Sequence, residues 1–136
     1  MTTMTDNERA LVQRHAMDLR EEEKAFRDSP DRAALEARLN ADPERLKYAG
    51  KAFMEVEAQI QQRGEHSKKK GYEVALEILV TRDRFLLELH RTDSIDRAVV
   101  AAKRRLEPQE LLSAALARTA RQDAVQHADD EHAPAF

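Results

Sequence analysis

The amino-acid sequence predicts an all-α protein of five to six helices, organised on a long antiparallel helical hairpin formed by residues of about 42–63 and 71–91. Three observations lead to this prediction. Charged residues make up 36% of the chain and aromatic residues only 4%, with three glycines, and such a composition favours helices. Apolar residues recur at helical spacing along most of the chain. Ser-Pro and Asp-Pro pairs, which are typical of helix starts, divide it.

Three helices are predicted in the first half of the chain. The first spans about 6–27, with its apolar residues on one face and the acidic run Glu21–Glu23 mostly outside that face. Ser29 and Pro30 begin a second helix that ends at about Asn40, because serine caps a helix and proline fits its first turn. Asp42 and Pro43 repeat this signal. The third helix, to about 63, has apolar residues spaced like a coiled-coil seam: Leu46, Ala49, Phe53, Val56 and Ile60.

The segment Gly64–Gly71 is polar and bracketed by glycines, so it is predicted to be the loop of the hairpin. The fourth helix, Gly71–His90, is the most apolar segment, with apolar residues around more than half of its circumference. It therefore needs packing partners on at least two sides. Its polar stripe is formed by Glu73, Glu77, Thr81, Arg84, Glu88 and Arg91.

Three polar side chains of the fourth helix, Arg82, Asp83 and His90, fall within its apolar arc. Buried charges must be paired, because an unpaired one costs several kcal/mol, on the order of 3–5. These residues are interpreted as a core network that fixes helix register, with a subunit interface or a ligand pocket as the alternatives.

The last third of the chain predicts two more helices. Asp93 or Ser94 caps the fifth, which has an apolar stripe and a basic opposite side. Pro108 opens the sixth, whose apolar signal fades after about Thr119. We predict one helical domain over 1–122 and an acidic, flexible tail over 123–136, because the tail is poor in large apolar residues.

Several kinds of chemistry lack their sequence signatures. The chain has no cysteine and five scattered histidines, and it contains no glycine-rich phosphate loop, nucleophile elbow or zinc-binding HExxH motif. Glu-x-x-His pairs, which a di-iron bundle requires, are also missing from the sequence. We therefore expect no enzyme, no cofactor and no metal site. One acidic group near the end could bind a divalent metal but is interpreted as a solvated tail: His127, Asp129, Asp130, Glu131 and His132.

Charge is unevenly distributed along the chain. Residues 63–105 contain 11 basic and 7 acidic residues, whereas the segments before and after them are acidic. The beginning of the sequence lacks the pattern of a secretory signal, and no apolar run approaches the roughly 20 residues needed to span a bilayer. A cytoplasmic location without membrane association is expected.

The resulting functional hypothesis is non-catalytic binding of another macromolecule, as an adaptor, regulator or inhibitor, by a homo-oligomer. The surplus apolar surface of the fourth helix and the seam of the third favour it. Candidate interaction residues, which a plain core would also require, are Leu46, Phe53, Val56, Ile60, Leu79, Arg82, Asp83, Phe85, Leu86, Leu89 and His90.

The alternative is a DNA- or RNA-associated accessory protein that uses the basic middle segment to neutralise phosphates. A solvated loop and helix face explain the same residues equally well. The candidate nucleic-acid-binding residues are Arg63, Lys68, Lys69, Lys70, Lys103, Arg104 and Arg105.

Overall fold

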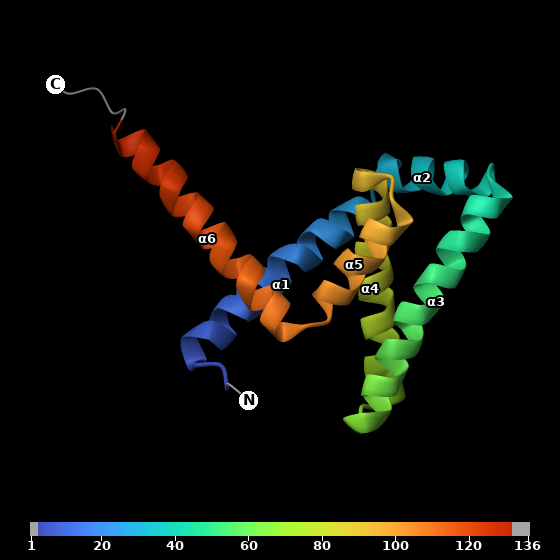
Figure 1. Ribbon diagram of the computed structural model, residues 1–136, viewed down its shortest axis with the longest axis horizontal. Helices are drawn as coiled ribbons and strands as arrows, with labels where there is room; N and C mark the ends of the chain where they lie inside the picture. Colours follow the sequence, from blue (N-terminus) through green and yellow to red (C-terminus); the bar gives the residue numbers. More distant parts are fainter. Residues whose placement is uncertain (1–2, 132–136) are drawn as a thin grey trace.

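A computed structural model describes the backbone of residues 3–131 and the side chains of residues 3–125 (Figure 1). Within this part of the chain the fold is all-helical, as predicted, with six helices and no strand. The helices are α1 (Asp6–Arg27), α2 (Pro30–Asn40), α3 (Pro43–His66), α4 (Gly71–Thr92), α5 (Ile95–Arg105) and α6 (Pro108–Glu131).

Most helix ends follow local signals that the sequence contains. Thr5 and Glu8 form a capping box at the start of α1. The Asp42 side chain accepts a hydrogen bond from the backbone N–H of Arg45 and caps α3. The choice left open between Asp93 and Ser94 is resolved, because Ser94 caps α5 while Asp93, with φ 54°, ends α4 in the left-handed conformation.

The turn between α3 and α4 is shorter than the predicted loop, since α3 continues to His66. Lys68 adopts φ 56°, and the N–H groups of Lys68 and Lys69 donate to the carbonyl oxygens of Glu65 and Gly64. This is a Schellman motif with lysine where glycine is usual. Gly64 is instead buried inside α3, where an added Cβ would lie 2.6 Å from a methyl group of Val74. Its role is to let α3 and α4 approach closely, so the prediction that it begins the loop is wrong.

Helix α4 lies at the centre of the fold and packs against α1, α2, α3 and α5 (Figure 1). Helices α3 and α4 form the predicted antiparallel hairpin, but they diverge away from their turn. At the open end α2 bridges them and contacts both. Pairing along the full length, as the sequence suggested, is therefore wrong, and α2 and α5 each contact both helices.

The main core gathers side chains from five helices. It consists of Phe26, Leu35, Leu39, Ala49, Phe53, Val56, Ile60, Phe85, Leu87, Leu89, Ile95, Ala98 and Ala102. Helix α6 is attached separately, by contacts with α1 and α5, and its last turns extend away from the other helices (Figure 1).

Helix α6 also continues past Thr119, where the apolar signal fades, to Glu131. The segment predicted as a flexible tail is thus helical over 123–131, and residues 132–136 lie outside the described residues. Among the described residues, no helix is both long and apolar enough to cross a membrane.

Candidate functional site

Two consecutive residues of α4, Asp83 and Arg84, are buried at the point where α1 crosses the helix. Asp83 is 1% exposed, and its carboxylate lies 3.1 Å from Nη1 of Arg20, 3.7 Å from Nη1 of Arg27 and 3.4 Å from Nη1 of Arg32. We call Asp83 with these three arginines the Asp83 cluster. It ties α1 and α2 to α4, so Asp83 belongs to a network within the chain.

Arg84 points to the other side of the α1 crossing. Its guanidinium donates to the carboxylates of Glu23 at 2.8 Å, Glu22 at 2.9 Å and Glu88 at 3.1 Å. Glu23, which is 0% exposed, also accepts from Nε of Arg105 at 3.0 Å. Arg91 adds a pair with Glu22 at 2.9 Å. The Arg84 cluster comprises Arg84, Arg91, Arg105, Glu22, Glu23 and Glu88.

These burials correct two expectations from periodicity. Arg84 was placed on the polar stripe of the fourth helix, and Glu23 was placed outside the apolar face of the first. Both side chains are buried because α1 crosses the polar stripe of α4 and matches its charges. Desolvation alone would raise the pKa of Glu22, but hydrogen bonds and charge from Arg84 and Arg91 hold it below the ordinary value. Desolvation likewise opposes the charge on Arg84, and its glutamate partners raise its pKa.

The other two polar residues of the apolar arc lie apart from Asp83. The His90 ring is half-buried, with its centre 5.4 Å from that of Phe26, and its Nε2 lies 3.7 Å from the carboxylate of Asp31. Arg82 is exposed and its guanidinium lies over the ring of Phe53, 5.1 Å from the ring centre. The three residues that the sequence grouped therefore form no single site.

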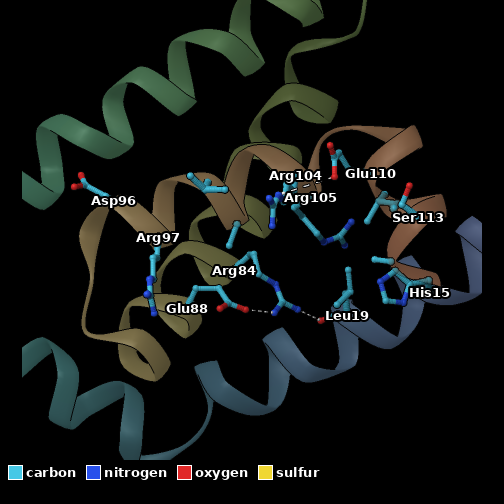
Figure 2. Close-up of a pocket in the computed structure, with 14 residues that line it drawn as sticks. His15, Leu19, Arg84, Glu88, Asp96, Arg97, Arg104, Arg105, Glu110 and Ser113 are labelled. Atoms are coloured by element: carbon cyan, nitrogen blue, oxygen red, sulfur yellow. Dashed lines mark hydrogen bonds and ion pairs between the residues drawn. The ribbon is translucent and has the colours of Figure 1, made fainter. Parts of the chain in front are cut away.

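A groove of about 880 Å³ runs between α1, α5 and α6, with Arg84 and Glu88 of α4 at its floor (Figure 2). Both arginines and acidic residues line the groove (Figure 2). Two of these arginines, Arg84 and Arg105, already donate hydrogen bonds to carboxylates. Val100 and Leu111 contribute apolar surface. Chemically, the groove offers a surface with mixed charges rather than a set of convergent groups of one sign.

His15 lies at the edge of this groove, near α6 (Figure 2). Its pKa is lowered, first by desolvation and then by the nearby positive charge of Arg118, with Asp18 acting in the opposite direction. Its Nδ1 is buried and has no hydrogen-bond partner among the described residues. Folding thus favours the neutral imidazole of His15 relative to its charged form.

Most candidate apolar anchors are part of the chain's own core. Phe53, Val56, Ile60, Phe85 and Leu89 are buried, and Leu86 is partly buried against the same core. Of the apolar candidates, only Leu46 and Leu79 are exposed. The buried candidates are therefore core residues, an interpretation that the sequence had left open.

The surplus apolar surface of α4 lies in its first half. Tyr72, Leu76 and Leu79 are 67%, 56% and 43% exposed and lie on one face of the helix. We call them the apolar stripe. The opposite face of this half, with Val74 and Ile78, packs against the core. The first half of α4 therefore has partners on one side only, whereas α1 covers the same face further along the helix.

Of the basic candidates, Arg105 lies in the Arg84 cluster, against Glu23 of α1. Arg63 donates to the carbonyl oxygen of Leu106 at 3.1 Å and to Glu107. This contact brings the end of α5 next to the turn after α3. Four of the candidates are already paired with acids: Arg63 with Glu107, Lys69 with Glu77, Arg104 with Glu110 and Arg105 with Glu23. Lys68, Lys70 and Lys103 have no acidic partner within ion-pair distance among the described side chains.

Sequence reasoning missed Arg20, Arg27 and Arg32. One signal was available: Arg20 and Arg27 are seven residues apart and so lie on one face of the first helix. Asp83, expected to be buried, requires such cations. The side chains of the C-terminal histidine and acidic group lie outside the described residues, and the described ones contain no group of three or more ligands placed to hold a metal ion.

Comparison of this chain with protein-family models, with curated proteins and with solved structures finds no match.

Proposed function

We propose that this protein is a non-catalytic binding protein that associates with a second copy of itself, and through that assembly with another macromolecule, by means of the apolar stripe of α4. The observation that supports the proposal is the exposure of three large apolar side chains at successive turns of the central helix. Contiguous exposed apolar surface of this kind is typical of protein–protein interfaces.

The surroundings of the stripe suit an interface. A groove of about 340 Å³ lies beside it, lined by Tyr72 and Leu76 and, across from them, by Leu106. Tyrosine and leucine side chains from a second helix could fill such a groove in the manner of interface anchors. The stripe also lies directly after the turn formed by Lys68, Lys69 and Lys70, which would form a polar rim.

The test is the change of Leu76 to glutamate. Light scattering at micromolar concentration should give the wild-type protein a mass of at least twice 15.6 kDa and the L76E variant the monomer mass, because a buried unpaired carboxylate at an interface costs several kcal/mol, on the order of 3–5. Circular dichroism should be unchanged, since Leu76 is exposed within one chain.

Leu116→Glu is the matched control, because Leu116 is 51% exposed and lies on α6, away from the stripe. It should leave the mass of the assembly unchanged. A monomer mass for the wild type would contradict self-association, and an L76E variant that remains assembled would show that the stripe is not the interface.

A second function has one specific observation in its favour. The turn Lys68–Lys70 lies next to the end of α5, and Lys68, Lys70 and Lys103 are without acidic partners in the described part of the chain. Lysines placed in this way could neutralise phosphates of DNA or RNA. We keep this as the alternative proposal.

A gel-shift assay on mixed-sequence DNA and RNA at low salt tests the alternative. If it holds, the triple variant Lys68→Glu, Lys69→Glu and Lys70→Glu should abolish the shift, and wild-type affinity should fall steeply with salt, since each phosphate contact contributes a slope of about −0.9 on B-DNA. The control replaces Lys24, Lys47 and Lys51, which are also exposed, with glutamate, for the same change in charge. No wild-type shift at low salt would exclude the alternative.

A further inference from the structure

The Asp83 cluster contains more positive charge than its single carboxylate neutralises. Three guanidinium groups lie within 3.7 Å of the single Asp83 carboxylate, and Arg32 has one further acidic partner, Glu36, at 2.9 Å. Among the described side chains, Arg20 and Arg27 have no acidic partner other than Asp83. Glu23 lies between them on α1, but its carboxylate faces Arg84 and Arg105.

The Arg84 cluster provides a comparison within the same fold. It contains three arginines and three glutamates, so its charges balance. Both clusters are built where α1 crosses α4. The imbalance of the Asp83 cluster is therefore a property of that site and not of buried charge in this protein generally.

Like charges this close repel one another, and partial burial weakens the screening that water supplies. An additional anion would offset that repulsion. The side chains of Arg20, Arg27 and Arg32 are 24%, 35% and 19% exposed, so part of each guanidinium is accessible to a ligand. Each group has five N–H donors in a planar fork, of which Asp83 can use only a few.

The fold also holds these donors in place. Arg20 and Arg27 project from one face of α1, and Arg32 projects from the first turn of α2 after a short corner. At the corner the Ser29 hydroxyl donates to the carbonyl oxygen of Phe26 at 2.7 Å, and Phe26 is buried in the core. Asp83 anchors all three side chains from below. Such preorganised arginine forks match the oxygens of a phosphate group.

We propose that Arg20, Arg27 and Arg32 form a binding site for a phosphate group, either inorganic phosphate or the phosphate of a small phosphomonoester. A phosphate anion supplies negative charge to three arginines whose acidic partners among the described side chains are only Asp83 and Glu36. This site is independent of the apolar stripe, and the proposal stands or fails separately from self-association.

The test uses the change of Arg27 to glutamine, because Arg27 is the most exposed of the three and its contact with Asp83 is the longest. Thermal unfolding is followed at pH 8 with increasing inorganic phosphate, and with chloride at equal ionic strength. Phosphate at a hundredfold excess over its Kd should raise the wild-type Tm by roughly 5–10 °C. A parallel series with glycerol phosphate distinguishes a site for phosphomonoesters from a site for inorganic phosphate alone.

Arg45→Gln is the matched control, since the Arg45 side chain is 34% exposed and pairs with one acid among the described side chains, Asp93. The R45Q variant should keep the full rise in Tm with phosphate, and the R27Q variant should lose most of it. Isothermal titration calorimetry should give one phosphate per wild-type chain. For R27Q it should give a Kd at least tenfold weaker. The absence of a phosphate-specific response in the wild type would overturn the proposal. So would an R27Q response equal to that of R45Q.

Discussion

Replacing Asp83 by asparagine is expected to lower the free energy of unfolding by about 3–5 kcal/mol. Asparagine keeps the shape of the side chain but removes the charge that holds three guanidinium groups together. The arginines would then repel one another where water is scarce. Because the cluster joins α1 and α2 to α4, the loss should appear as a lower urea midpoint of the cooperative transition with little change in its slope.

Asp93→Asn is the control for this prediction. Asp93 also pairs with an arginine, Arg45, at 2.8 Å, but its side chain is 78% exposed. Exposed pairs contribute only about 0–1 kcal/mol, and asparagine tolerates the left-handed conformation that residue 93 adopts. If D83N and D93N have the same urea midpoint, the Asp83 cluster does not stabilise the fold as argued.

Replacing Arg84 by methionine is the second change with a large expected effect, again about 3–5 kcal/mol of unfolding free energy. Methionine fills a similar volume but leaves Glu23, which is fully buried, with Arg105 as its one remaining cationic partner among the described residues. One oxygen of Glu23, Oε1, already has no hydrogen-bond partner there. The variant should therefore unfold at a clearly lower urea concentration.

A double-mutant cycle separates the energy of the Arg84–Glu23 ion pair from the energy of lost packing. The combined variant Arg84→Met and Glu23→Gln should be more stable than the sum of the single changes implies, by roughly 1–3 kcal/mol, because the two side chains interact directly. Arg91→Met is the control, since Arg91 bonds to the same Glu22 as Arg84 but is 47% exposed. Additive effects in the cycle would argue against the pairing.

Local signals account for much of the secondary structure. The Ser-Pro and Asp-Pro pairs start α2 and α3 where predicted. The Asp42 side chain caps α3, whereas the Ser29 side chain makes no capping hydrogen bond to α2, so the fixed φ of Pro30 is the local signal there. The turn after α3 was harder to place. Gly64 was taken as its first residue, yet it lies within α3, where the close approach of Val74 leaves no room for a side chain, and no local pattern reveals that contact.

The candidate sites depended far more on contacts between distant segments. The spacing of residues shows which side of the fourth helix is polar and which is apolar. It does not show which of these sides another helix will cover. Tyr72 and Leu76 on its apolar arc are exposed, and Arg84 on its polar stripe is buried. Both differences have one cause, the path of α1 across the second half of α4.

By itself, the sequence determined that the chain is helical, where most helices begin, and which helix is central, because composition, caps and period are local properties. The tertiary structure alone decided that Glu23 and Arg84 are buried. Glu23 and Arg84 are separated by 61 residues. Each can be buried because partners from distant segments neutralise it, Arg105 as well as Arg84 for Glu23, and Glu22 as well as Glu23 for Arg84. A charge on a helix surface looks solvated until its partner is known, so the two clusters around α4 appear only in the folded chain.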